Sequence, residues 1–424
     1  MINSKKKGFT IVELVIVVAV IAILAAVLIP TFSNLVKKAN ISSDTVLAKN
    51  LNTALSLYEA ENDVADFEAA LEGIKEHGYL ISNLNAKTKG CFFVWEQETN
   101  QILLVDSTEN YKVLFSIRDG YGEPDDSWYF AISSKEVAEK VKREKSNVII
   151  KLTVADMDNL EEVLSTGGEV YLDESIIIND QNLIKLEAAD KVVTINLGKA
   201  TLNTNGILTD KTPITVNAGT LNINNGVIGA AGSYVDADGK VVNTPIYVEK
   251  DGKVNIDGTT FNAAQNGYLY LNGENTIKNA TINAEFIGIY ARGINVLDNT
   301  VITSKGRIIW ACNHETNAAD AGKITINSGT YTGGSSQFGA ITTCGSFVEI
   351  NGGDFFANEG TKLFHIFNNG EIARRSTITI TGGTFNGIPF ADLDVTEWNA
   401  LCGPTSKASI SDDGKTVTIK FSVE

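Results

Sequence analysis

The sequence of 424 residues contains little proline, histidine, cysteine or methionine, and its charge is far from balanced. The formal net charge of −16 excludes the basic footprint that a nucleic-acid partner would need. Three histidines and four cysteines, without a CxxC pair, leave little material for a zinc site or a disulfide scaffold. We therefore expect no metal, no cofactor and no nucleic-acid partner.

What the chain does contain is a long apolar run near its start. Residues 9–29 read FTIVELVIVVAVIAILAAVLI, and Glu13 is the only charge among them. The uncharged part of this run, residues 14–29, has about the length that a helix needs to cross the core of a bilayer. Lys5, Lys6 and Lys7 precede it, which predicts a cytoplasmic N-terminus.

Two common explanations account poorly for this run. A secretory signal peptide would place small residues at a cleavage site after the run, whereas Pro30, Thr31 and Phe32 follow and the helical pattern continues. An ordinary membrane anchor gives no reason for Glu13, because a charge inside a membrane is costly and usually functional.

The segment KKKGFTIVELVIVVAVIAILAAVLIP closely resembles the class III leader of type IV prepilins and type II secretion pseudopilins. The resemblance implies that prepilin peptidase cuts between Gly8 and Phe9 and that the new amine is methylated. Glu13 matches the glutamate of that family, and Pro30 matches its helix-bending proline. In a filament core the Glu13 carboxylate would pair with the Phe9 amine of a neighbouring subunit, which lowers the cost of burying the charge.

The resemblance, together with the pattern after the apolar run, predicts a mixed protein in five segments. These are a leader at 1–8, a membrane or filament-core helix at 9–62, a small α+β pilin-like head at 63–132, a charged helical or linker segment at 133–150, and an all-β domain at 151–424. The head is expected to contain a helix at 67–76 and strands at 91–96, 101–106, 111–116 and 127–132.

An acidic loop, RDGYGEPDD at 118–126, lies between the last two of these strands. Asp119, Glu123, Asp125 and Asp126 could offer oxygen ligands to calcium, but the ordered spacing of a calcium loop is missing. We therefore expect a solvated acidic turn.

The second half contains an internal repeat of eight residues, which alternates apolar and polar residues, turns on small residues and ends on an apolar one. The copies are LNINNGVI (221–228), VNIDGTTF (254–261), NTIKNATI (275–282), INVLDNTV (294–301), ITINSGTY (324–331), VEINGGDF (348–355) and ITITGGTF (378–385). A second short apolar segment follows nearly every copy, for example LYLNG, IYARG, IWACN and ITTCG. This pattern predicts a right-handed parallel β-helix whose coils stack, with asparagine and glycine at the bends.

Both ends of this repeat are expected to be covered. Residues 154–178 read as a helix, a Gly-Gly turn and a strand, and they resemble the N-terminal cap of pectate-lyase-like β-helices. Residues 409–421 read as a hairpin around Asp413–Gly414. In the middle, IWACN and ITTCG occupy equivalent places, so Cys312 and Cys344 should lie on adjacent strands as free thiols.

Many β-helices act on polysaccharides, so an enzyme is a natural alternative. Asp257, Asp298 and Asp354 occupy different positions in their repeats, whereas glycoside hydrolysis needs two carboxylates at a set separation. His365 and Arg374–Arg375 form the one tempting basic set, but Arg374–Arg375 precede a strand as an ordinary turn would, and His314 reads as a loop residue. We expect no enzyme, with a surface-tethered polysaccharide lyase or hydrolase as the alternative.

The sequence thus predicts a pilin-like subunit or a minor pseudopilin of a secretion or DNA-uptake machine. It would be held in the cytoplasmic or inner membrane by one span and later be present at the cell surface in a filament. Its partners would be prepilin peptidase, other pilin subunits and the membrane. The β-domain would serve adhesion or glycan binding, and aromatic residues of the second segments could offer stacking surfaces: Tyr247, Tyr268, Tyr270, Tyr290 and Trp310.

Overall fold

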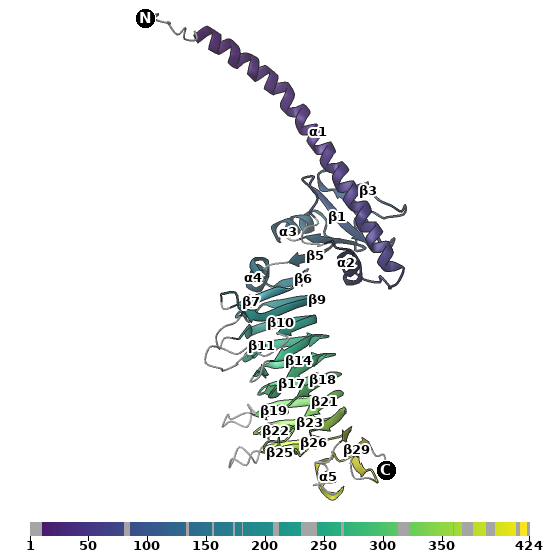
Figure 1. The fold of residues 1–424 in the computed structure, drawn as a ribbon, viewed down its shortest axis with the longest axis vertical. Coiled ribbons are helices and arrows are strands. Elements are labelled where there is room, and N and C mark those ends of the chain that lie inside the picture. Colours follow the sequence, from purple (N-terminus) through teal and green to yellow (C-terminus); the bar gives the residue numbers. More distant parts are fainter. Residues whose placement is uncertain are drawn as a thin grey trace, which may run out of the picture. The chain divides into compact units, whose positions relative to one another are not determined.

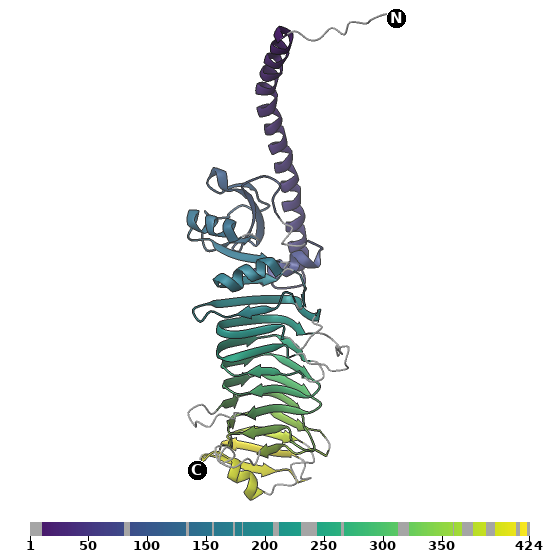
Figure 2. The same cartoon turned by 90° about the vertical axis from the view of Figure 1, so that its left-hand side faces the viewer.

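The structure is a computed structural model, and it describes the chain except residues 1–10, 80–84, 133–134, 155–156, 173, 180, 207–211, 230–243, 264–266, 313–321, 359, 367–375, 387–394, 413–415 and 422–424. The chain divides into two compact units, Met1–Ile150 and Lys151–Glu424. The first combines a long helix with a small α+β head, and the second is mostly β (Figures 1 and 2).

One helix, α1 (Ile11–Glu59), dominates the first unit, and it differs sharply along its length. Its first half exposes large apolar side chains on all sides, from Ile11 at 82% exposure to Phe32 at 69%. Its second half is buried along one stripe that includes Ala48, Leu51 and Leu55. The amphipathic pattern of the second half therefore packs against the head, as the helical spacing of its apolar residues predicts.

Two buried polar side chains fix the head onto α1. The Asp44 carboxylate accepts hydrogen bonds from the backbone N–H groups of Lys87 (2.8 Å) and Thr88 (2.9 Å). The Asn52 side chain accepts from the N–H of Ile102 and donates to its carbonyl, both at 2.8 Å. Asn52 thus satisfies a strand edge that would otherwise be buried without partners.

The head is an antiparallel sheet. β1 (Cys91–Glu96) pairs with β2 (Gln101–Asp106) and β4 (Trp128–Ile132), and β2 also pairs with β3 (Lys112–Phe115). The short helix α2 (Phe67–Glu76) begins at the N-cap Asp66 and is followed by Gly78, which has a φ of 85°. These elements lie within a residue of the ranges expected from the sequence.

The charged segment at 133–150 contains a helix, α3 (Lys135–Glu144), that packs into the head. Val141 and Val148 are fully or almost fully buried, and they belong to the same apolar cluster as Trp128 and Phe130. The helical alternative therefore describes this segment, and its described part contributes to the core of the first unit. Because the segment is highly charged, its sequence did not indicate that these two valines are buried.

The second unit is a stack of short strands that pair in parallel from one coil to the next. One row comprises β14 (Glu274–Lys278), β17 (Ile294–Asp298), β20 (Lys323–Ile326), β23 (Phe347–Ile350) and β26 (Thr377–Ile380). A second comprises β12 (Thr260–Ala263), β15 (Thr281–Ala284), β18 (Thr300–Ser304), β21 (Gly329–Gly333), β24 (Asp354–Ala357) and β27 (Gly383–Asn386).

A third row comprises β13 (Leu269–Leu271), β16 (Ile287–Ala291), β19 (Arg307–Cys312), β22 (Ile341–Cys344) and β25 (Phe364–Ile366). The longer strands β9 (Val192–Gly206), β10 (Ile214–Gly229) and β11 (Ile246–Asp257) precede these rows and each serve more than one of them. Antiparallel pairs occur in the head and at the C-terminal end, so the strand pairing of the chain as a whole is mixed.

The register corrects one of the repeats read from the sequence. Asn275 pairs with Asn295, and Asn295 pairs with Ile324, so the fourth copy runs 295–302 and not 294–301. Ile294 is 55% exposed and Asn295 is buried. Since side chains alternate across a strand, a slip of one residue exchanges the inner and outer sets. The expectation was wrong because asparagine occupies an inward position that is apolar in most other copies.

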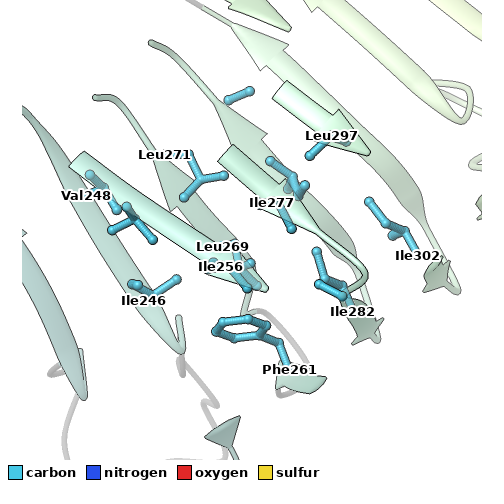
Figure 3. Close-up of a cluster of buried hydrophobic side chains, with 14 of the residues drawn as sticks. Ile246, Val248, Ile256, Phe261, Leu269, Leu271, Ile277, Ile282, Leu297 and Ile302 are labelled. Atoms are coloured by element: carbon cyan, nitrogen blue, oxygen red, sulfur yellow. The ribbon is translucent and has the colours of Figure 1, made fainter. Parts of the chain in front are cut away.

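The repeats bury one continuous apolar core. Figure 3 shows aliphatic side chains from successive coils pointing inward, among them Val248, Ile277 and Ile302. Three aromatic rings further along form an inner ladder, defined here as Tyr331, Phe355 and Phe385, with centroids 4.8 Å apart at each step. Each inner-ladder residue is fully buried. A single coil could not enclose such side chains, so the coils depend on one another.

Asparagine and glycine occupy the bends for identifiable reasons. Asn225, Asn279 and Asn299 have a positive φ, and Asn299 donates a side-chain hydrogen bond to Asn279 on the adjacent coil at 2.8 Å. At Gly273 and Gly293 the backbone of the preceding coil lies too close for any Cβ atom. A second asparagine bond between coils runs from Asn255 to Asn222 at 2.8 Å, so asparagine side chains link the coils at more than one level.

Secondary structure of other kinds lies at both ends of the stack (Figure 1). α4 (Met157–Thr166) packs beside β6 (Gly168–Leu172) and β8 (Ile184–Leu186), close to β5 (Ile149–Val154) and β7 (Ile176–Asn179) in the chain. At the other end, α5 (Val395–Leu401) adjoins β28 (Ser406–Ile410), which pairs antiparallel with β29 (Thr416–Phe421). Asp413–Gly414, the expected turn, lies outside the described residues.

Candidate assembly helix and outer face of the strand stack

The candidate processing and assembly residues fall at the start of the chain. Gly8 and Phe9 lie outside the described residues, whereas Glu13 stands in the first turn of α1 and Pro30 lies within it. The helix continues through Pro30 as one element, although proline has no N–H to offer the preceding turn. α1 curves along its length in Figure 1.

The first half of α1 has the properties of a segment that another apolar phase must cover. Among the described residues, α1 is the one helix long and apolar enough to cross a membrane, by length and composition, with a mean hydropathy of 3.2 over its best window. None of that window is buried within the chain. Exposed apolar surface of this extent marks contact with lipid or with other protein.

The outer face of the third strand row carries the aromatic side chains singled out in the sequence. Pairing places Tyr247, Tyr270, Tyr290 and Trp310 on successive coils, and we call these four residues the outer ladder. Tyr247 and Tyr270 stack at 4.1 Å, and Tyr290 and Trp310 stack at 4.6 Å. Tyr270 and Tyr290 meet edge to face at 5.3 Å, and Tyr268 also contacts Tyr290.

The two ends of the outer ladder differ. At Trp310 the guanidinium of Arg307 lies 4.4 Å from the ring centroid and 4.0 Å from that of Phe338. Both faces of Trp310 are occupied, because Tyr290 and Arg307 cannot share one face at these distances. At Tyr247, by contrast, the next residue of the row is Thr215 and the one after it is Lys185.

A hollow of about 660 Å³ opens at the Tyr247 end. Its described lining residues come from several coils of the second unit and are mostly polar: Gln181, Leu183, Lys185, Thr212, Thr215, Asn217, Tyr247 and Glu249. Burial is the main cause that raises the pKa of Tyr247, with hydrogen bonding to Tyr270 next and a smaller contribution from Glu249. The phenol of Tyr247 therefore remains neutral near neutral pH.

The sequence singled out the aromatic residues but not this hollow. Its polar residues come from three separate coils, and nothing in the spacing of Gln181, Thr212 and Glu249 relates them. Only the strand register brings Lys185, Thr215 and Tyr247 into line. Arg307 was missed for the same reason, since it begins a strand in which the adjacent apolar residues dominate the pattern.

The carboxylates weighed as catalysts are not arranged as first expected. Asp257 and Asp298 share one position of the coil, separated by Lys278 on the coil between them, so the expectation of different positions is wrong for this pair. The error follows from the one-residue slip in the fourth repeat. Asp257 accepts a hydrogen bond from Asn279 and Asp298 accepts one from Ser328, while Asp354 lies in another strand row.

The basic candidates are dispersed. His365 lies in the third strand row, near Phe338, and burial first, then Lys362 and Arg307, lower its pKa. His314 and Arg374–Arg375 lie outside the described residues. The described residues therefore give the hydrolase or lyase alternative no support.

The structure also describes the cysteine pair and the acidic loop that the sequence singled out. Cys312 and Cys344 are register partners on β19 and β22, and both are buried free cysteines, so the expected alignment is confirmed. In the acidic loop, Asp125 accepts hydrogen bonds from Ser127 and Arg118 forms an ion pair with Glu59 at 3.4 Å. The described part of the chain contains no group of three or more histidine, cysteine or carboxylate side chains placed to hold a metal ion.

Comparison with known proteins supports the N-terminal part. The family described as "Prokaryotic N-terminal methylation motif" matches residues 3–29. The chain is 50% identical over 60 residues to the type IV wide pilus major component PilA4 of Thermus thermophilus, which is 13% of this chain and 44% of that protein. It is 39% identical over 56 residues to the type IV major pilin protein PilE1 of Neisseria gonorrhoeae, which is 13% of this chain and 34% of that protein.

The chain is also 43% identical over 53 residues to a fimbrial protein of Moraxella nonliquefaciens, which is 12% of this chain and 34% of that protein. The matches span less than half the length of these relatives. No solved structure matches the chain. The chain is therefore pilin-like in its N-terminal part, with a methylation motif of the type IV class, and this points to a structural subunit.

Proposed function

We propose that the chain is a prepilin-like or pseudopilin-like subunit that prepilin peptidase cuts between Gly8 and Phe9. The observation that carries the proposal is the coincidence of the methylation motif at 3–29 with a helix whose most apolar stretch contains no buried residue. A membrane covers that surface before assembly, and neighbouring subunits cover it in the filament. Lys5, Lys6 and Lys7 keep the N-terminus on the cytoplasmic side.

Glu13 and Pro30 have separate roles in this proposal. The Glu13 carboxylate pairs with the methylated Phe9 amine of a neighbouring subunit, so that neither charge is buried alone. Pro30 lets the helix bend between its membrane half and its head-bound half, because the missing N–H weakens the turn before it.

The second unit is proposed to be a right-handed parallel β-helix, comprising residues 151–424, with α4 as a cap at one end and the β28–β29 hairpin at the other. The coil-to-coil parallel pairing of the three strand rows supports this fold, and the right hand follows the usual chirality of parallel crossovers. After assembly this unit is displayed at the cell surface for adhesion or glycan binding. Residues 1–8, 9–62, 63–132 and 133–150 would then be leader, assembly helix, head and connecting helix.

Mass analysis of the mature N-terminus tests the assembly proposal. The expected mature chain begins at N-methylated Phe9, and Glu13→Val leaves membrane insertion intact while filament assembly falls, since the partner of the incoming amine is gone. Val12→Ala, next to Glu13 and also exposed, is the matched control and should assemble normally. A retained Met1, or normal filaments from Glu13→Val, would contradict the proposal.

A further inference from the structure

The outer ladder ends at Tyr247, because the next residue of the row has a small side chain. Tyr247 has one ring partner among the described residues, Tyr270, which stacks on one face with planes 3° apart. On the other side the row continues with Thr215 and then Lys185. Strands lie about 4.8 Å apart, so roughly 10 Å separates the levels of Tyr247 and Lys185, with only a short threonine between.

This change from a large to a small side chain creates the hollow of about 660 Å³ described above. Its floor is an aromatic face, half-buried and held rigidly by the ring beneath it. A face of this kind carries partial negative charge from its π electrons and attracts the weakly positive C–H groups of a ligand. At the opposite end of the ladder, the Arg307 guanidinium lies over the Trp310 ring, and Phe338 packs against that guanidinium.

The rim of the hollow is polar and nearly balanced in charge. Gln181 and Asn217 offer amide groups that both donate and accept hydrogen bonds, and both are exposed. Glu249 offers a carboxylate acceptor and Lys185 an ammonium donor. An apolar floor surrounded by mixed donors and acceptors is complementary to a ligand with one C–H face and hydroxyl groups around its edge.

We propose that this hollow binds one hexopyranose unit of a surface glycan, with Tyr247 as the stacking platform and Glu249, Lys185, Gln181 and Asn217 as partners for its hydroxyl groups. The proposal rests on the proposed function of the second unit, which is glycan binding at the cell surface, and it assigns that binding to one site. A highly charged ligand fits less well, because one carboxylate and one ammonium face the same space. The remaining outer-ladder rings then act as the support that holds Tyr247 in place.

The test uses the full chain in detergent and saturation-transfer NMR with a panel of methyl glycosides of glucose, galactose, mannose and N-acetylglucosamine. At least one glycoside is expected to bind. Thr215→Phe adds one ring to the ladder and covers Tyr247, so the dissociation constant of that glycoside should rise at least about tenfold. Tyr247→Phe keeps the ring face and should change the dissociation constant by less than about threefold.

Thr325→Phe is the matched control, because Thr325 is also half-buried on a strand of the stack but belongs to another row. It should bind the glycoside as the parent chain does. If Thr215→Phe does not fold, Glu249→Gln provides the second variant, with the dissociation constant expected to rise at least about fivefold. Circular dichroism melting establishes folding for each variant.

The proposal is overturned if no glycoside of the panel binds, or if a folded Thr215→Phe chain binds as well as the Thr325→Phe control. Its failure is distinct from failure of the assembly proposal, which the mass of the mature N-terminus decides. If Phe9 is N-methylated but no glycoside binds, only the hexopyranose site is rejected. A retained Met1 with glycoside binding removes only the assembly role.

Discussion

The strand stack contains two ladders of aromatic rings that look alike in geometry and differ in what surrounds them. In the inner ladder, Tyr331, Phe355 and Phe385 stack at 4.8 Å and are fully buried. In the outer ladder, Tyr247, Tyr290 and Trp310 also stack on a neighbouring ring but remain partly exposed, whereas Tyr270 between them is 6% exposed and meets Tyr290 edge to face. Since stacking is common to both, any difference in their effect on stability measures burial, and the outer ladder is free to serve contacts with other molecules.

The largest expected effect lies in the inner ladder. Phe355→Ala should lower the free energy of unfolding by about 3–5 kcal/mol, because it removes a ring from both neighbours and leaves a cavity that the coils cannot close. Phe356→Ala is the matched control on the same strand, since that ring is 41% exposed, and it should cost less than about 1 kcal/mol. Urea unfolding of the full chain followed by circular dichroism compares them, and equal losses would contradict the assigned inward and outward positions.

A smaller effect is expected from the asparagines that interrupt the apolar interior. Asn275 donates to the side-chain oxygen of Asn295 at 3.0 Å, and both are buried. Asn295→Val should cost about 1–3 kcal/mol, because the Asn275 amide loses its acceptor. The double variant Asn275→Val/Asn295→Val removes both partners, matches the apolar residues of other coils and should recover most of this loss.

The same urea unfolding measures both variants. A double variant that is less stable than the single one would show that the pair contributes more than its mutual hydrogen bond. The result also shows how stable the inward asparagine pair is, and Asn295 of this pair is the residue that displaced the predicted fourth repeat by one position.

The aromatic and aliphatic periodicity was sufficient to predict the strands at 91–96 and 101–106, the helix at 67–76 and the alignment of Cys312 with Cys344. It failed where polar residues take inward positions. Asn295 shifted the register, and nothing in the sequence around Asp44 and Asn52 indicates that their side chains bond to the head. Such partners are distant in sequence, so local patterns carry no signal of them.

The candidate sites divide in the same way. The N-terminal motif is contiguous, and its residues could be named from the sequence alone. The hollow beside Tyr247 is built from residues of three coils, including Gln181 and Glu249, and it depends on a register that only the three-dimensional pairing supplies.

Replacing one ring of the outer ladder by alanine should lower the free energy of unfolding by less than the same change in the inner ladder. Tyr290→Ala loses its stacking on Trp310 and its edge contact with Tyr270, and ring pairs contribute about 0.5–1.5 kcal/mol each beyond their buried area. We expect a loss of about 1–3 kcal/mol by urea unfolding. A loss as large as that of Phe355→Ala would mean that the outer ladder belongs to the core, and Phe286→Ala, at 46% exposure, is the control for a weakly packed ring.

The smallest expected effect is a dependence on alkaline pH to which both ladders contribute. Burial raises the pKa of Tyr331 in the inner ladder, with Asp298 as a further cause, and burial raises the pKa of Tyr290 in the outer ladder. In the unfolded chain a tyrosine ionises near pH 10, whereas these phenols stay protonated in the folded chain at that pH. The folded state then binds more protons than the unfolded state, so stability is full below about pH 10 and falls as pH rises above it. The loss is about 0.4 kcal/mol for each such tyrosine when the pH equals the unfolded pKa.

Tyr331→Phe removes one of these two ionisable phenols. The free energy of unfolding of this variant, measured with urea, should therefore fall less steeply than that of the parent chain between about pH 9 and 11. Tyr121→Phe, in the acidic loop of the other unit, is the control and should leave the slope for the second unit unchanged. An identical slope for Tyr331→Phe and the parent chain would mean that the inner ladder does not keep its phenol from ionising.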